Sequence, residues 1–502
     1  MCGSAETVIP SRYRVRVFRP DIRGTQQMVF SSLVFLCIFL PVVFCLHCLV
    51  RPIAAKNVLL IIASLLFYAF GEPVYVLLLI ASAFLNYLFA AAMGEEGRKP
   101  VLIAAVIVNI GILGVFKYAG FLVDTVNTVA CLSLPVPQIK LPIGISFFTF
   151  QALSYVIDVY NGQCKVQRNF FKVLLYISLF PQLIAGPIVK YRDIEAEIDS
   201  RQVVIPEAAA GLRRFVFGLS KKVLVANTMA VAADAVFASE TGSMHAAAAW
   251  VGAVAYALQI YFDFSGYSDM AIGMGRMFGF HFKENFNFPY TSSSIGEYWR
   301  RWHISLGSFF RDYLFFVPIF GKRRQYASLF LVWFCTGLWH GANWTFVIFG
   351  LYHGLFIFLE GKNRRLLKKV PNGILHVYTL LVVVIGHVIF RSDSLTYAFQ
   401  YIGRMFSGFN GSAVSLSLAL QQLTPFFLAV LAAAIFFSGP FRGIAERLHL
   451  VPGAKKGKKG AAVQEAGRTA EGVLYVLAFA LLVWCLIRLS GGSYNPFIYF
   501  QF

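Results

Sequence analysis

The sequence predicts an all-α protein that crosses a membrane many times. Of its 502 residues, 58% are hydrophobic and 14% are charged, and the mean hydropathy is +0.67. Soluble domains carry about 25% charged residues, so this composition is typical of a polytopic membrane protein. The apolar runs are continuous over roughly 20 residues, which favours spanning helices over the alternating strands of a barrel.

We expect about 11 transmembrane helices, with re-entrant and interfacial helices, in one domain over residues 28–502. The candidate spans are residues 29–50, 57–71, 73–93, 101–123, 141–160, 221–238, 246–262, 326–339, 344–359, 374–390, 416–437 and 472–489. Residues 170–189 contain Pro181, Gly186 and Pro187, which predicts a broken or re-entrant helix. Residues 190–214 are expected to form an amphipathic surface segment.

The basic residues indicate orientation in the membrane rather than a nucleic-acid partner. The formal net charge is +20, and the positive charges cluster between apolar runs, as at residues 362–365 and 455–459. Basic loops of this kind are typical of the cytoplasmic side. Residues 452–468 are therefore expected to be a basic cytoplasmic loop. The N-terminus would lie outside, where the five arginines of residues 1–27 do not fit. We interpret residues 1–27 as a non-native or disordered extension, with translation starting at Met28.

Several common catalytic and metal-binding motifs are absent from the sequence. Six of its eight cysteines lie in or beside apolar runs and no HExxH motif occurs, so neither a disulfide framework nor a metal site is expected. There is also no GxSxG elbow and no Walker loop. The glycine-rich stretch at residues 273–279 follows no strand, and helix packing explains it better than dinucleotide binding.

Residues 298–354 contain the strongest candidates for chemistry. They read YWRRWHISLGSFFRDYLFF, a basic spacer, and then TGLWHGANWTFVIFGLYHG. Ionisable groups in apolar surroundings cost free energy unless they are paired or line a wet cavity. His340 could be a packing histidine, but an imidazole can also accept a proton from a hydroxyl at neutral pH. We predict that His340 is functional and that the fold brings His303 close to it.

Other polar residues of the apolar runs have simpler explanations. Trp299 and Trp302 would lie at the level of the lipid headgroups, with Arg300 and Arg301 facing phosphates. We assign His353 and His387 mainly to structure. Asp263 and Asp269 could belong to a proton or ion path, although hydrogen-bonded carboxylates at helix ends explain them equally well.

These stretches resemble the two signatures of the membrane-bound O-acyltransferase (MBOAT) family, in its bacterial alginate O-acetylase-like branch. Further similar stretches are VFKYAGF at residues 115–121, LPIGISFFTFQALSYVIDVY at 141–160, LFPQLIAGPI at 179–188 and YFDFSGYSDMAIG at 261–273. The resemblance covers residues 28–502. It implies a ring-like bundle of tilted helices with a central tunnel that joins the two sides of the membrane.

The resemblance also implies an activity and its residues. The catalytic histidine of the WHG signature falls on His340, and the second family position, a His, Asn or Asp, falls on His303. Candidates for contacts with substrate along the tunnel are Trp339, Asn343, Arg311, Asp312 and Trp302. No bound cofactor is expected, because acetyl-CoA or another acyl thioester would be a co-substrate. The implied acceptor is an exported polysaccharide such as alginate, at the bacterial inner membrane, with periplasmic acetyltransferase partners.

Two other classes of function remain open from the sequence. A transporter of acyl groups or ions could use Asp263, Asp269 and the histidines as a relay, although no inverted repeat is visible. The chain could also be a scaffold that recruits a soluble acetyltransferase.

Overall fold

The computed structural model describes residues 28–94, 97–184, 186–318, 321–322, 324–447, 461–492 and 495. Within these ranges every extended regular element is a helix. The predicted extension, residues 1–27, lies outside the described residues.

The first half of the chain forms short and long helices around one hydrophobic core. They are η1 (Phe35–Phe39), α1 (Leu40–Leu49), α2 (Ile53–Gly71), α3 (Tyr75–Met93), α4 (Lys99–Leu113), η2 (Gly114–Tyr118), α5 (Ala119–Ala130), α6 (Ile145–Tyr160), α7 (Phe170–Ser178), α8 (Phe180–Leu183), α9 (Tyr191–Ser200), α10 (Ile205–Ser220), η3 (Lys221–Ala226) and α11 (Asn227–Phe237).

The second half continues with helices of more varied direction. They are η4 (Thr241–Ser243), α12 (Ala246–Met277), η5 (Pro289–Thr291), α13 (Ile295–Arg301), α14 (Ile304–Phe310), η6 (Arg311–Phe315), α15 (Gln325–His340), α16 (Trp344–Lys362), α17 (Arg364–Leu367), α18 (Asn372–Arg391), α19 (Leu395–Ser407), η7 (Gly408–Asn410), α20 (Ala413–Gln422), α21 (Pro425–Ser438), α22 (Phe441–Arg447) and α23 (Ala461–Ser490).

The helices are those of a multi-pass membrane protein. Among the described residues, eight are long and apolar enough to span a bilayer, or nine if the bent pair α20 and α21 forms one span. Two shorter apolar helices, Phe35–Leu49 and Ile145–Tyr160, coincide with expected spans. The all-helical class is confirmed, whereas the number 11 stays a prediction. Helix α23 begins at Ala461, so the end of the predicted loop 452–468 is helical, and residues 452–460 lie outside the described residues.

Two continuous helices replace what the sequence divided into several segments. Residues Ile205–Phe237 form one continuous helix that is apolar enough to span a bilayer. The prediction of an amphipathic surface segment over residues 190–214 is therefore wrong for its second part, after α9. Helix α12 runs without a break over Ala246–Met277, well past the expected end at residue 262. Polar residues such as Asp263 and Asp269 suggested an end to the apolar run, but both carboxylates pair with basic side chains of the neighbouring helix.

Glycines let these two helices pack with their backbones in contact. A Cβ atom on Gly211 would lie 2.5 Å from the carbonyl oxygen of Gly273, and one on Gly218 would lie 2.5 Å from that of Gly266. Small residues at such crossings are typical of membrane helix pairs. The glycine-rich stretch at residues 273–279 thus begins in a helix interface, as expected.

The predicted break within residues 170–189 is confirmed. Helix α7 ends at Ser178, Leu179 has an extended ψ of 111°, and the single turn α8 follows. The side chains around this break are buried. Non-helical backbone is tolerated at membrane depth only where protein surrounds it, and this segment meets that condition.

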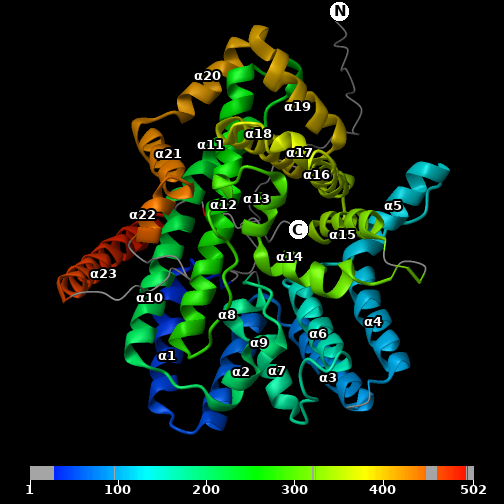
Figure 1. Ribbon diagram of the computed structural model, residues 1–502, viewed down its shortest axis with the longest axis vertical. Helices are drawn as coiled ribbons and strands as arrows, with labels where there is room; N and C mark the ends of the chain where they lie inside the picture. Colours follow the sequence, from blue (N-terminus) through cyan, green and yellow to red (C-terminus); the bar gives the residue numbers. More distant parts are fainter. Residues whose placement is uncertain are drawn as a thin grey trace, which may run out of the picture.

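The molecule has two hydrophobic cores that share the long helices. One core contains residues of α1 to α4, α6 to α10 and the C-terminal half of α12, and the other contains residues of α11, the N-terminal half of α12, α16, α18 and α19. Figure 1 shows the first set in the lower half of the view and the second set in the upper half, with α10 to α12 running between them. Helices α13, α14 and α15 lie in the middle, where the two cores meet.

Candidate active site

His303 lies at a sharp turn between α13 and α14. Its φ of 44° and ψ of 53° are left-handed, which is uncommon for a residue other than glycine. Backbone strain of this kind persists only when the surroundings hold it in place, and it clusters at functional sites. The turn is held by two hydrogen bonds to the preceding loop, from Ile304 N to Asn285 O and from Asn287 N to Arg301 O, both 2.9 Å.

Asn285, together with Ser305, fixes the orientation of the His303 ring. Its Oδ1 accepts from the backbone N–H of Ser305 at 3.2 Å and from Ser305 Oγ at 2.8 Å. Because a backbone N–H can only donate, the atom that faces it must be the amide oxygen. His303 Nδ1, at 3.1 Å from the same oxygen, is then the protonated nitrogen. A neutral His303 therefore presents a lone pair at Nε2, which is buried without a hydrogen-bond partner among the described residues.

His340 lies at the C-terminal end of α15, and its side chain is 5% exposed. Aromatic rings cover two of its sides, with ring centroids at 5.1 Å for Phe390 and 5.9 Å for Phe349. Its Nδ1 is buried and makes no hydrogen bond within the described part of the chain. Glycines hold α15 closely against α16, since a Cβ atom on Gly350 would lie 2.1 Å from the carbonyl oxygen of Trp333.

The indole of Trp339 contacts both imidazoles. Its ring centroid lies 5.7 Å from that of His303 and 5.0 Å from that of His340. The two imidazoles also interact electrostatically, although 37 residues separate them in the chain. The indole Nε1 is a third buried polar atom without a partner among the described residues. Buried polar groups are nearly always hydrogen-bonded, so three rings in contact, each with an unpaired nitrogen, mark a place for water or a substrate.

Arg311 and Asp312, two of the predicted contacts with substrate, belong to a network of charges. Asp312 pairs with Lys190 at 2.6 Å, with Arg192 at 3.1 Å and with Arg311 at 3.0 Å. Arg192 also pairs with the buried Asp158 at 3.3 Å. Burial alone would raise the pKa of Asp312, but hydrogen bonds from Lys190 and Arg311 hold that pKa below its ordinary value. These contacts are those of a structural network.

Asn343 and Trp302 also make structural contacts. Asn343 Oδ1 caps α16 by accepting from Thr345 N at 3.0 Å, and its Nδ2 donates to Asp393 O at 3.1 Å. Trp302 is 5% exposed and stacks on Tyr298 with ring centroids 5.6 Å apart. The expectation that Trp302 lies at the lipid headgroups is wrong, because its ring is packed inside the second core.

The carboxylates of α12 lie in the middle of the helix and not at its end. Asp263 pairs with Lys222 at 2.8 Å, and Asp269 pairs with Arg214 at 2.8 Å and Lys221 at 2.6 Å. The interpretation that placed both carboxylates at helix ends is therefore wrong. Both carboxylates are nevertheless paired. These ion pairs join α12 to α10 and η3.

Three residues around the histidines were missed by the sequence reasoning. Asn285 and Ser305 orient His303, and Lys117 lies beside the end of α15. Nothing in a single sequence distinguishes Asn285 from other loop residues. Lys117 did carry a signal, because it is a lone lysine within an apolar run.

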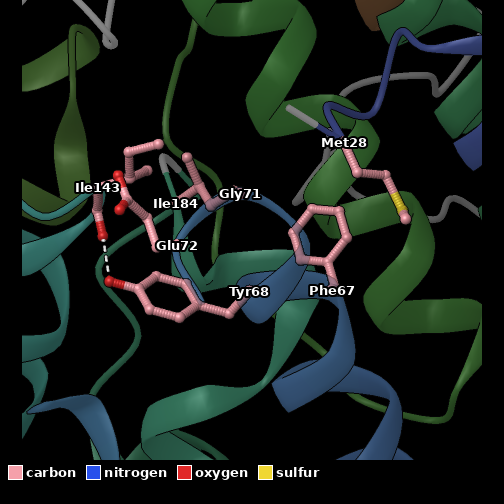
Figure 2. Close-up of a pocket in the computed structure, with 7 residues that line it drawn as sticks. All are labelled: Met28, Phe67, Tyr68, Gly71, Glu72, Ile143 and Ile184. Atoms are coloured by element: carbon pink, nitrogen blue, oxygen red, sulfur yellow. Dashed lines mark hydrogen bonds between the residues drawn. The ribbon is translucent and has the colours of Figure 1, made fainter. Parts of the chain in front are cut away.

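The structure contains a small pocket away from the histidines. Figure 2 shows it between α2, the segment before α6 and the end of α8, with Tyr68 donating a hydrogen bond to Ile143 O. Neither His303 nor His340 lines it. In the described part of the chain, no group of three or more His, Cys, Asp or Glu side chains could hold a metal ion. The central tunnel stays a prediction.

Comparison with known proteins identifies relatives over nearly the whole chain. The sequence model of MBOAT, the membrane-bound O-acyltransferase family, matches residues 165–390. A protein of Azotobacter vinelandii named probable alginate O-acetylase AlgI is 38% identical, over 95% of this chain and 100% of the relative. The peptidoglycan O-acetyltransferase of Helicobacter pylori is 34% identical over 76% of this chain and 80% of its own length.

A more distant relative transfers a different acyl group, according to its name. The teichoic acid D-alanyltransferase of Bacillus subtilis is 28% identical over 48% of this chain and 65% of its own length. The 38% identity with the Azotobacter vinelandii protein, over that relative's full length, shows the family. The chain is a multi-pass membrane O-acyltransferase and belongs to the membrane-bound O-acyltransferase family.

Proposed function

We propose that the protein transfers an acetyl group from a thioester donor, acetyl-CoA, to hydroxyl groups of an exported polysaccharide such as alginate, with His340 as the general base. The observation that carries this proposal is the contact between the rings of His303, Trp339 and His340 at the junction of the two cores. Each of these side chains has one buried nitrogen without a hydrogen-bond partner among the described residues.

The chemistry requires a base and a donor of a hydrogen bond. The hydroxyl oxygen attacks the thioester carbonyl carbon while His340 accepts the hydroxyl proton. A C–O bond forms, the C–S bond breaks, and the proton passes from His340 to the departing thiolate. The products are an acetyl ester and a free thiol. A thioester is activated enough that no acyl-enzyme intermediate is needed.

Trp339 is suited to stabilise the negative charge that develops on the carbonyl oxygen. An indole Nε1–H can only donate, and this one is buried, unpaired and in contact with both histidines. His303 is less suited to that task while it is neutral, because its Nδ1–H is bonded to Asn285 and its Nε2 can only accept. We therefore assign His303 to orienting an N–H or O–H group of a substrate.

The acceptor and the location are inferred from the relatives. Those that the chain matches over their full length are named for alginate, and another is named for peptidoglycan, which favours a polysaccharide outside the bacterial inner membrane. Periplasmic acetyltransferase partners would complete the transfer. The ion pairs of Asp263 and Asp269 argue against the transporter alternative, since paired carboxylates make a poor relay.

The test is the fate of acetyl groups in cells that carry the variant His340→Ala in place of the wild-type protein. Cells are given isotope-labelled acetate, and the label is counted in purified surface polysaccharide. A general base contributes about 10²- to 10⁴-fold, so labelling should fall at least 100-fold. The amount of protein in the membrane and the amount of polymer should stay the same. Normal labelling with this variant would contradict the role of His340.

A second experiment addresses the donor and the scaffold alternative. The purified full-length protein in lipid nanodiscs is given acetyl-CoA labelled in the acetyl group and mannuronate oligosaccharides. Label on the oligosaccharide, without any other protein, would exclude a mere scaffold. Labelling that requires an added periplasmic protein would support transfer through a partner, whereas consumption of no acetyl-CoA in either case would contradict the proposed donor.

A further inference from the structure

Lys117 lies in an apolar helix at an irregular turn. It belongs to η2, the π-helical turn that joins α4 to α5 within the apolar span Lys99–Ala130. Such single turns inside α-helices occur frequently at functional sites. A lysine within an apolar span costs free energy unless it finds partners or a wet cavity. This one is half-buried, and its contacts lead to the candidate active site.

The Lys117 ammonium caps the end of α15. Its Nζ donates to the carbonyl oxygen of Trp339 at 2.5 Å and to Ser146 Oγ at 3.3 Å. The hydroxyl of the adjacent Tyr118 donates to the carbonyl oxygen of Leu338 at 2.9 Å. The last carbonyl groups of a helix have no partner within the helix and carry partial negative charge. Two neighbouring residues of η2 thus fix the two peptide groups that precede His340.

Two contacts of Lys117 favour a charged amine and oppose the cost of its burial. The Nζ atom lies 5.9 Å from the centroid of the Trp339 ring, within the range of a cation–π interaction. The carbonyl end of α15 adds a further attraction for a cation. Both effects offset part of the cost of burying the charge.

The same ammonium acts on the His340 imidazole through space. Two titratable side chains of the described residues interact electrostatically with His340. They are Lys117 and His303. The rings of Trp339, Phe349 and Phe390 pack against the imidazole. Burial disfavours the protonated imidazole most, and the nearby positive charge disfavours it further. A general base has to be neutral before it can accept a proton.

We propose that Lys117 is a positioning residue for the reaction: its ammonium holds the Trp339–His340 end of α15 in place and keeps His340 neutral. This inference rests on the proposed function of His340. It gives the lysine two effects that can be separated, a hydrogen bond to a carbonyl group and a positive charge beside the base.

Three variants test whether these effects matter in cells that incorporate labelled acetate, and Lys117→Gln separates the hydrogen bond from the charge. Lys117→Met removes the hydrogen bond and the charge, Lys117→Arg keeps both, and Tyr118→Phe removes only the neighbouring neutral hydrogen bond to α15. We expect at least a 10-fold loss of acetylation per molecule of membrane protein for Lys117→Met. Lys117→Arg and Tyr118→Phe should stay within about 3-fold of the wild type. If Lys117→Met does not accumulate, Lys117→Gln keeps an N–H donor without the charge and replaces it.

The pH dependence of transfer is the second measurement. In nanodiscs with acetyl-CoA and mannuronate oligosaccharides, the rate should rise with pH as the base loses its proton. Removing the neighbouring positive charge favours the protonated imidazole, so the pH of half-maximal rate on the acidic side should rise by about one unit in Lys117→Met or Lys117→Gln. Tyr118→Phe should leave this pH unchanged, because it removes no charge.

The outcomes distinguish this inference from the proposed function. If His340→Ala retains acetylation, the proposed function is wrong. If His340→Ala is inactive while Lys117→Met acetylates like the wild type, or like Tyr118→Phe, Lys117 is only a helix cap. If Lys117→Arg is as inactive as Lys117→Met, the positive charge is not what matters.

Discussion

Two polar regions inside the protein differ in how their groups are paired. Around Asp312 the charged side chains Lys190, Arg192 and Asp158 each have a partner of opposite charge, although Asp158 Oδ2 has no hydrogen-bond partner among the described residues. In the group formed by His303, Trp339 and His340, each side chain has a buried nitrogen without a partner among the described residues.

This difference separates stability from reactivity. A buried group that is fully paired offers nothing to a ligand, and its removal leaves an uncompensated partner. A buried group that is left unpaired costs about 1–3 kcal/mol, which a protein tolerates where water or a substrate completes the bond. Substitutions in the two regions should therefore affect different measurements.

The largest effect should come from Trp339→Phe, which removes the Nε1–H and keeps an aromatic ring. Loss of one preorganised donor to a developing oxyanion costs about 10²- to 10³-fold in rate. We expect acetyl transfer to fall by about 100-fold, with little change in thermal stability. Trp333→Phe, on the same helix, is the matched control and should transfer within about 3-fold of the wild type. Equal rates for the two variants would remove Trp339 from the reactive group.

Asn285→Leu should have the next largest effect, because it frees the His303 ring. The variant loses the acceptor for His303 Nδ1 and for two donors of Ser305. Orienting partners of this kind are typically worth about 10-fold or more in activity. The rate of transfer by the purified protein measures it. Ser268→Ala, which removes only the partner of Asn285 Nδ2, should change the rate less than 3-fold. The opposite ranking of these two variants would contradict the role given to Asn285.

Asp312→Asn should lower stability and not the rate per folded molecule. Removing one member of a buried pair costs about 3–5 kcal/mol, and because the Asp312 side chain is 25% exposed we expect about 1–3 kcal/mol. Its pKa is lowered in the folded state, so this stabilisation is present at neutral pH and is lost as the pH falls through the ordinary aspartate value of about 3.9 and below. Thermal unfolding against pH measures both effects.

The control for Asp312→Asn is Glu471→Gln. Glu471 pairs with Arg213 at the surface, where its side chain is 57% exposed, and exposed pairs contribute about 0–1 kcal/mol. A loss of transfer rate by Asp312→Asn without a loss of stability would place Asp312 with the reactive groups and would remove the distinction between the two regions.

His353→Phe should have the smallest effect and would define the boundary of the reactive group. Both ring nitrogens of His353 are also buried without a partner among the described residues. The Phe349 ring, however, contacts both His353 and His340, with centroid distances of 4.8 and 5.9 Å, and so stands between them. We expect transfer within about 3-fold of the wild type. A loss of 10-fold or more would extend the reactive group to α16 and α18.

The sequence predicted the helical class and the two histidines because both leave local signals. Apolar runs reveal spans, and an imidazole among tryptophans is conspicuous. The continuity of α10 with α11 and the full length of α12 were not predictable, because the charges that interrupt the apolar pattern are paired only in three dimensions, as Asp269 is with Arg214. For the same reason the ion pairs of Asp312 were not predictable, and its contact with substrate stays a prediction.

The left-handed backbone at His303 limits which amino acids this position accepts. Besides glycine, the residues most often found in that conformation are asparagine, aspartate and histidine. These three are also the types that the family resemblance implies at position 303. The turn and the hydrogen bond to Asn285 therefore constrain this position together, and alanine or a β-branched residue would lose both. The replacement that disturbs the turn least is asparagine, so His303→Asn isolates the loss of the imidazole itself.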